Sequence, residues 1–124
     1  MVVDDDEVVL EVTREHLESA GFQVTTRSSA IGTSAAVGRE EPDIVLLDVN
    51  IPGLSGDTLA RLIAQAQPHR PAVILYSSAS RERLAGLAKT CGAVGIIEKT
   101  SSRAFFLGQL DACLVGLVPK RRDR

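Results

Sequence analysis

Side chains that could bind a cation or a phosphoryl group follow four short apolar runs of the chain. In chain order they are Asp4, Asp5 and Asp6, then Asp48, then Ser77 and Ser78, and finally Glu98 and Lys99. If the four runs are parallel strands, their carboxyl ends meet at one edge of a sheet, and ligands of such sheets bind outside that edge. We therefore expect carboxylates, hydroxyls and one ammonium group to lie together there.

A cluster of carboxylates at this edge would need a cation. Two carboxylates about 4 Å apart repel each other by ~4 kcal/mol at an effective dielectric constant of about 20. Mg²⁺ would relieve that repulsion, because it takes oxygen ligands from one or two carboxylates, water and phosphate. The alternative is that Asp4–Asp6 only begin a helix, with acids at its positively polarised end. That alternative explains Asp6 and Glu7 well but explains Asp4 poorly, since Asp4 falls at the strand end.

Asp48 comes directly after the apolar run 44–47, where a charge needs a partner. Lys99 or a metal ion could supply that partner. A carboxylate beside Mg²⁺ and an ammonium group can attack a phosphoryl group and form an acyl phosphate. The alternative is a buried ion pair between Asp48 and Lys99 that does no chemistry.

The elements needed to position these groups alternate along the chain. Short apolar runs rich in β-branched residues predict strands at 1–3, 22–26, 43–47, 72–76 and 93–97. Apolar residues at helical spacing predict helices at 8–20, 59–66, 84–91 and 106–117, with a weaker helix around 31–38. The runs 43–47 and 72–76 are apolar throughout, as parallel strands covered on both faces require. Right-handed crossovers then give a three-layer α/β domain.

The composition is that of one globular domain. The chain has 124 residues, and domains average about 150. No apolar run approaches the ~20 residues that span a bilayer, so we expect no membrane insertion, and the start of the chain is acidic where a secretory signal is basic. Cys91 and Cys113 make no disulfide framework and, with His16 and His69, fit no zinc spacing. A reduced, cytoplasmic setting is the simpler interpretation.

Charge is distributed unevenly along the chain. The net charge is −2. The last five residues, four basic and one acidic, carry +3, which leaves −5 on residues 1–119. Because aromatic residues are only 3% of the chain, stacking platforms are lacking as well, and we expect no direct binding of nucleic acid. The basic end is interpreted as a solvated terminus or the start of a linker.

With these features, the chain resembles the receiver domain of bacterial two-component response regulators, including the chemotaxis-regulator type. The resemblance rests on VVDDD, PDIVLLDVNIPGLSG, PAVILYSS and CGAVGIIEK, in this order. It covers residues 1–118 and leaves 119–124 as a basic tail or linker start. It implies a flavodoxin-like (βα)5 fold whose five-stranded parallel sheet has the order 2-1-3-4-5.

The resemblance also implies roles in phosphoryl binding. Asp48 would be the phosphoacceptor, and Lys99 would pair with it first and bind a phosphoryl oxygen afterwards. Ser77 would hydrogen-bond the phosphoryl group through its hydroxyl, and Ser78 through its backbone N–H. The domain would then catalyse its own phosphorylation and dephosphorylation without being a conventional enzyme.

The same resemblance implies a Mg²⁺ site. Asp5 would bind the ion directly and Asp4 would act through water. Asp48 would add a carboxylate oxygen, and Asn50 its backbone carbonyl.

Three positions depart from the usual receiver pattern. Thr100 follows Lys99 where the family usually has a cis proline, so that loop is either trans and reshaped or strained. Ile96 replaces the switch aromatic, so the coupling from site to surface must differ. Ala79 stands where many receivers hold a polar side chain that aims the attacking water, which predicts slow self-dephosphorylation.

The implied partners are a sensor histidine kinase or a histidine phosphotransfer protein as donor. A downstream protein would bind the face formed by the fourth helix, fifth strand and fifth helix. One alternative is a degenerate receiver that binds proteins without using phosphate. Another is an aspartyl phosphohydrolase of the haloacid-dehalogenase kind, which is disfavoured because Asn50 stands where that class needs a second acid.

Overall fold

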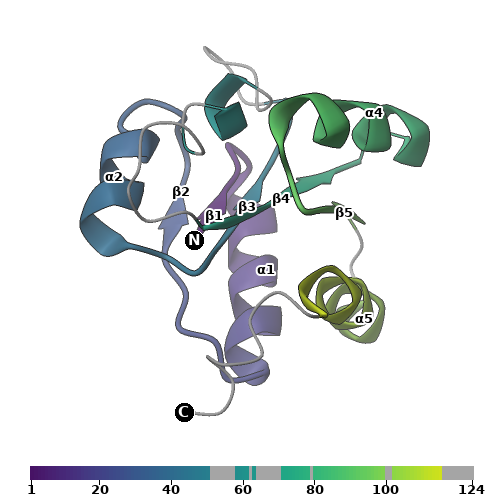
Figure 1. Cartoon of the computed structure of the whole chain (residues 1–124). Helices are drawn as coiled ribbons and strands as arrows, with labels where there is room; N and C mark the ends of the chain where they lie inside the picture. Colours follow the sequence, from purple (N-terminus) through teal and green to yellow (C-terminus); the bar gives the residue numbers. More distant parts are fainter. Residues whose placement is uncertain (51–57, 62, 64–70, 79, 100–101, 116–124) are drawn as a thin grey trace.

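A parallel five-stranded sheet organises the molecule (Figure 1). The computed structural model describes residues 1–50, 58–61, 63, 71–78, 80–99 and 102–115. The strands are β1 (Val2–Val3), β2 (Thr26–Arg27), β3 (Ile44–Leu47), β4 (Ala72–Ser77) and β5 (Gly95–Glu98). Their order is β2-β1-β3-β4-β5, and every neighbouring pair is parallel. The predicted flavodoxin-like order is therefore confirmed.

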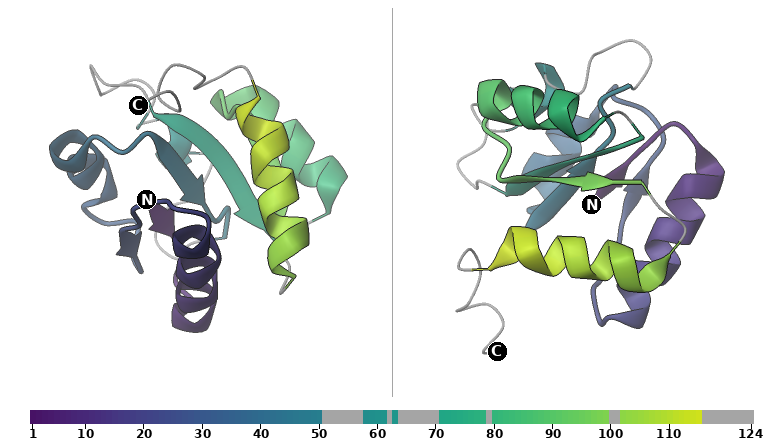
Figure 2. Two further views of the ribbon diagram at one scale, coloured as in Figure 1. Left: turned by 90° about the horizontal axis from the view of Figure 1, so that it is seen from below. Right: turned by 90° about the vertical axis from the view of Figure 1, so that its right-hand side faces the viewer.

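Helices cover both faces of this sheet, which gives the three expected layers. They are α1 (Glu7–Ser19), α2 (Thr33–Glu40), α4 (Arg81–Cys91) and α5 (Arg103–Leu114), and residues 58–61 and 63 are also helical. The right-hand view of Figure 2 has α4 on one side of β5, with α1 and α5 on the other. Among the described residues, no helix combines the length and apolar character needed to cross a membrane.

Strand alternation divides the core into two clusters. Val45 and Leu47 of β3 face the cluster that includes α2 and α4, whereas Leu46 between them faces the cluster that includes α1 and α5. All three side chains are almost fully buried. Each buried side chain of this size stabilises the fold by ~1.5–3 kcal/mol. The continuously apolar sequence of this strand follows from having a core on each side.

Side-chain caps start α1, α4 and α5, the helices that follow β1, β4 and β5. Asp6 accepts the N–H groups of Val8 and Val9 at 2.9 and 3.3 Å, as a helix-capping aspartate does. Ser80 and Ser102 cap α4 and α5 in the same way. The interpretation of Asp6 as a cap is confirmed. The ends of β1, β4 and β5 are thus each followed within a few residues by a capped helix.

Several residues expected to pack do so. Phe106 is fully buried, while its neighbour Phe105 is 54% exposed. The His16 ring lies 5.7 Å from the Phe106 ring, so His16 is a packing residue. Cys91 is buried, but Cys113 is only partly buried, and its Sγ lies 3.7 Å from the Ile96 carbonyl oxygen of β5.

The second strand is shorter than predicted. The sequence predicts a strand over 22–26, but only Thr26 and Arg27 pair, with Val2 and Val3. The reason is that a strand exists only where it has a partner, and β1 offers two residues. Residues 22–24 therefore have no ladder bond to β1, and Thr25 takes part only by accepting the Val2 N–H through its carbonyl.

Candidate functional site

The carboxyl ends of the strands bring the predicted residues to one edge of the sheet. Asp4 follows β1, Asp48 follows β3, Ser77 ends β4, and Lys99 follows β5. Backbone bonds fix this arrangement, since Asp48 N–H donates to the Val3 carbonyl at 3.0 Å and Lys99 N–H donates to the Ser77 carbonyl at 3.0 Å. The prediction that these groups converge is borne out for Asp4, Asp48 and Lys99 by direct contacts.

Lys99 is shared between two buried carboxylates. Its Nζ lies 2.7 Å from Asp4 Oδ2 and 3.4 Å from Asp48 Oδ2. Asp4 is 0% exposed and Asp48 is 4% exposed, whereas the Lys99 side chain is 20% exposed. The expected pairing of Lys99 with Asp48 is present, and a shorter one with Asp4 accompanies it.

Burial and pairing oppose each other in this cluster. Burial raises the pKa of Asp4, and its contact with Lys99 only partly offsets that effect. For Lys99, burial acts to lower the pKa, but the neighbouring carboxylates of Asp4 and Asp48 outweigh it and raise the pKa above its usual value. The ammonium is thus firmly held in its charged form.

The carboxylates are suited to a divalent cation. Asp4, Asp5 and Asp48 each offer one oxygen, and these oxygens lie within 4.8 Å of one another. Asp4 Oδ2 is buried and lies 2.7 Å from the Lys99 ammonium. Three carboxylates face one ammonium, so negative charge remains in excess. An oxygen-only donor set with excess negative charge fits Mg²⁺.

The loop after β3 holds the other Asp48 oxygen. Asp48 Oδ1 accepts the backbone N–H of Asn50 at 3.2 Å, while Oδ2 faces Lys99. Asn50 and Ser78 are exposed, and Ser77 is 1% exposed. The Asp48 carboxylate is therefore oriented through both of its oxygens.

Tyr76 is a neighbour of the site that the sequence did not indicate. Its ring centroid lies 5.7 Å from Lys99 Nζ, a cation–π distance. Its hydroxyl lies 3.2 Å from the hydroxyl of Thr13 on α1, and both residues are buried. Burial raises the pKa of Tyr76. The available signal was strand alternation, which turns Tyr76 toward α1 and α5.

Gln109 is a second residue near the site that the sequence did not indicate, and its side chain forms hydrogen bonds with the end of β5. The Glu98 N–H donates to Gln109 Oε1 at 3.1 Å, and Gln109 Nε2 donates to the Glu98 carbonyl at 3.4 Å. Because β5 is an edge strand, this side chain replaces the missing neighbour strand. It fixes the peptide group directly before Lys99. A glutamine on a helix carries no sequence signal for such a role.

Of the three positions that depart from the usual receiver pattern, Ile96 lies among the residues that the structure describes. Ile96 is half-buried against the cluster that includes α4. Ala79 and Thr100 lie outside the described residues, as do His69 and the tail 119–124.

A doubly wound parallel sheet of this order, with acids and a lysine at its carboxyl edge, defines a class of α/β signalling domain. Residues 1–110 match the response regulator receiver domain family, and the chain belongs to that family. The resemblance seen in the sequence is thereby confirmed.

Individual relatives agree with this assignment. The probable transcriptional regulatory protein TcrX of Mycobacterium tuberculosis is 34% identical over 88 residues, covering 70% of this chain and 38% of TcrX. The transcriptional activator protein PfeR of Pseudomonas aeruginosa is 32% identical over 125 residues, covering 100% of this chain and 39% of PfeR. The chain thus spans about two-fifths of the length of these relatives.

Solved structures share the fold. Chemotaxis protein CheY4 of Vibrio cholerae has a TM-score of 0.81 at 22% identity, over 91% of this chain and 95% of the CheY4 chain. A CheY-like receiver domain protein from Methanospirillum hungatei has a TM-score of 0.79 at 23% identity, over 92% of this chain and 90% of that one.

Proposed function

We propose that Asp48 is the phosphoacceptor of this receiver domain. The observation that carries the proposal is the contact of Lys99 with both Asp4 and Asp48. It leaves Asp48 oriented, buried and beside a cation. Residues 1–118 would form the receiver, and residues 119–124 a basic tail or linker start.

The proposed reaction is a transfer from a phosphohistidine. An Asp48 oxygen attacks phosphorus, the new O–P bond forms as the P–N bond breaks, and the histidine nitrogen leaves with the electron pair and gains a proton from water. Lys99 then binds a phosphoryl oxygen, Ser77 donates its hydroxyl, and Ser78 donates its backbone N–H. Such transfers depend on positioning and charge neutralisation.

The metal site would be formed by Asp5, by Asp4 acting through water, by Asp48 and by the Asn50 carbonyl. Bound Mg²⁺ would supply positive charge against the negative charge of the phosphoryl oxygens. The oxygens of Asp4, Asp5 and Asp48, which lie within 4.8 Å of one another, support this assignment.

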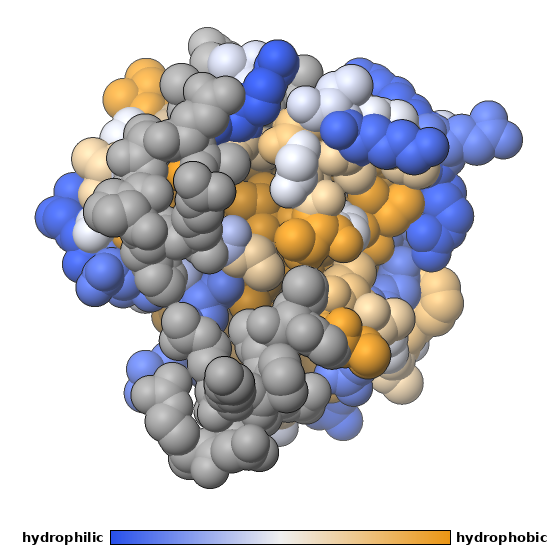
Figure 3. Space-filling model, in the orientation of Figure 1, coloured by the Kyte–Doolittle hydropathy of each residue, from blue (hydrophilic) through white to orange (hydrophobic). Residues whose placement is uncertain are grey.

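The phosphoryl donor would be a sensor histidine kinase or a histidine phosphotransfer protein in the cytoplasm. The downstream partner would bind the face of α4, β5 and α5. Figure 3 shows apolar surface gathered between α4 and α5 on this side. Val94, directly before β5, and Phe105 of α5 are exposed, and exposed apolar side chains suit protein binding. No direct contact with nucleic acid or membrane is proposed.

The test is incubation with acetyl phosphate and Mg²⁺, followed by intact-mass measurement. The wild type should gain one phosphoryl group, Asp48→Asn should gain none, and EDTA should abolish uptake. Asp111→Asn is the matched control, because it removes an exposed aspartate far from the site and should behave as wild type. No uptake by the wild type would instead indicate a degenerate receiver. Repeated release of phosphate from small phosphoesters would indicate a hydrolase.

A further inference from the structure

Tyr76 stands in one row with the two buried carboxylates of the acidic cluster. The last pairs that β3 makes with β1 and with β4 share Leu47. The next position along each of these three strands is occupied by Asp4, Asp48 and Tyr76. The residue before each of them belongs to the core cluster that includes α4. Because side chains alternate along a strand, these three leave the sheet on the other side, toward α1 and α5.

Lys99 reaches back over this row from β5. It lies two positions beyond Ile97, which is the β5 partner of Tyr76. Its Nζ lies 2.7 Å from Asp4 Oδ2, 3.4 Å from Asp48 Oδ2 and 5.7 Å from the centroid of the Tyr76 ring. The face of an aromatic ring carries partial negative charge, which attracts an ammonium group at this distance. The ring is therefore a third attractive neighbour of the Lys99 ammonium.

Two contacts within the core fix the Tyr76 ring. Its hydroxyl lies 3.2 Å from the Thr13 hydroxyl of α1, and its centroid lies 5.6 Å from that of the Phe106 ring of α5. All three residues are buried. A close-packed side chain that is held at both its ring and its hydroxyl has little freedom to turn. The ring thus offers a rigid surface to the ammonium.

The order of the strands decides what this surface does. Because β3 lies between β1 and β4, Asp48 is the middle member of the row, with Asp4 on one side and Tyr76 on the other. The shorter contact draws the ammonium toward Asp4. Attraction by the ring acts from the opposite side of Asp48. Lys99 is a flexible side chain, and these opposed contacts hold its charge beside the middle carboxylate.

We propose that Tyr76 is a positioning residue for Lys99, whose ammonium it keeps beside Asp48 against the shorter contact with Asp4. Tyr76 acts on a phosphoryl group only through Lys99. The consequence for phosphoryl uptake rests on the proposed function of Asp48, whereas the position of the ammonium does not. Without the attraction of the ring, Lys99 is held less firmly at the attacking carboxylate.

Hydrogen exchange of the Lys99 ammonium, followed by NMR of ¹⁵N-labelled lysine, tests the position without a phosphoryl donor. Tyr76→Phe and Tyr76→pentafluorophenylalanine both lack the hydroxyl and are similar in shape, but fluorine reverses the charge on the ring face. Exchange should stay close to wild type in Tyr76→Phe and be about tenfold faster in the fluorinated variant. Equal exchange in the two variants would overturn the proposal.

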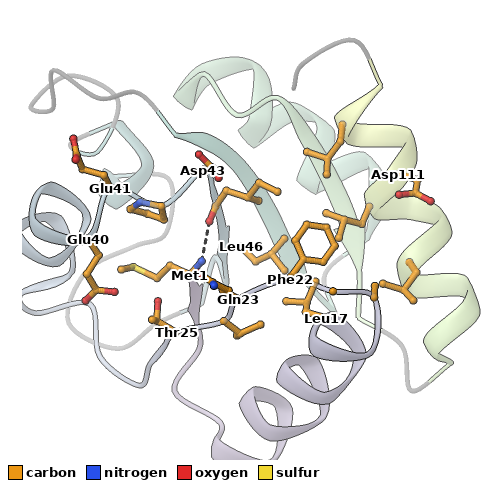
Figure 4. A pocket seen from close by; sticks show the side chains of 18 residues that line it. Met1, Leu17, Phe22, Gln23, Thr25, Glu40, Glu41, Asp43, Leu46 and Asp111 are labelled. Carbon is orange, nitrogen blue, oxygen red and sulfur yellow. Dashed lines mark hydrogen bonds between the residues drawn. The ribbon is translucent and has the colours of Figure 1, made fainter. Parts of the chain in front are cut away.

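Loosening of the core has its own matched control. Phe22 packs against the same core cluster as Tyr76, but it lies near Met1 and Leu46, where the strands begin (Figure 4). Tyr76→Leu should speed exchange of the Lys99 ammonium, and Phe22→Leu should leave it unchanged. Equal acceleration by both would assign the effect to general loosening and overturn the proposal. If Tyr76→Leu fails to fold, the comparison of the two ring variants decides.

A double-mutant cycle tests whether Tyr76 acts through Lys99. The difference in urea midpoint between the two ring variants should shrink when Lys99→Met is added, because the ammonium that distinguishes the rings is then gone. An unchanged difference would show that the ring does not interact with Lys99.

Phosphoryl uptake from acetyl phosphate with Mg²⁺ measures the consequence for the reaction. Uptake should be about tenfold slower in the fluorinated variant than in Tyr76→Phe. Equal uptake, with the expected difference in ammonium exchange, would overturn the role in the reaction and leave the positioning. Absence of uptake by the wild type would contradict the proposed function of Asp48, and ammonium exchange would still decide the position of Lys99.

Discussion

Lys99 Nζ lies 0.7 Å closer to Asp4 than to Asp48, at 2.7 against 3.4 Å. The lysine is therefore anchored by a carboxylate that is not the proposed phosphoacceptor. Because the Lys99 ammonium contacts both carboxylates, it could bind a phosphoryl group on Asp48 and still keep its contact with Asp4.

Replacing Lys99 should cost both stability and phosphoryl uptake. Lys99→Met leaves the buried Asp4 and Asp48 carboxylates without their ammonium, and we expect a loss of about 1–3 kcal/mol at pH 7. Urea unfolding measures this loss. Lys99→Arg is the control, because it keeps the charge and should lose less stability. Equal stability of Lys99→Met and wild type would show that the ion pairs contribute nothing.

Tyr76 should report on the site by fluorescence. It is the sole tyrosine of a chain without tryptophan, and its ring lies beside Lys99. Its emission should change on addition of Mg²⁺ and again with acetyl phosphate. The same titration of Lys99→Met should give a smaller change. Tyr76→Phe removes the contact with the Thr13 hydroxyl and should cost about 1–2 kcal/mol by urea unfolding. An emission that never changes would contradict the expected coupling.

Gln109 should stabilise the end of β5. Gln109→Leu removes both hydrogen bonds to the backbone N–H and C=O of Glu98, and we expect a loss of about 1 kcal/mol and faster amide exchange at Glu98. Gln109→Glu keeps the acceptor for the Glu98 N–H, so exchange at that amide should stay close to wild type. Fast exchange in both variants would show that the acceptor is not what protects this amide.

The N-terminal ammonium should make stability depend on pH. Its folded pKa of about 6 lies below its ordinary value of 8.0, so between these values the unfolded chain binds more protons. Stability should therefore rise as the pH rises from about 6 to 8, by up to ~2–3 kcal/mol. Urea unfolding at pH 5.5, 7 and 8.5 measures this. An N-acetylated chain lacks the group and should show a flatter dependence; identical profiles would refute the assignment.

The strand order and the convergence of Asp4, Asp48 and Lys99 could be predicted because parallel strands deliver their carboxyl ends to one edge. The boundaries of β2 could not, since they depend on how many residues β1 offers. The preference of Lys99 for Asp4 depends on side-chain geometry within one small cluster. The brace by Gln109 joins positions eleven residues apart on different elements, and residue type alone does not reveal such a contact.

Helix α5 joins the two edges of the domain. It begins at Arg103, four residues after Lys99, hydrogen-bonds the backbone of Glu98 through Gln109, and ends at Leu114, which lines a pocket with Met1 and Phe22 where the strands begin. Twelve helical residues span about 18 Å, and the buried Phe106 and Leu110 hold the helix against the core. A displacement of the end of β5 would therefore act, through Gln109 and this one rigid helix, on the opposite end of the domain.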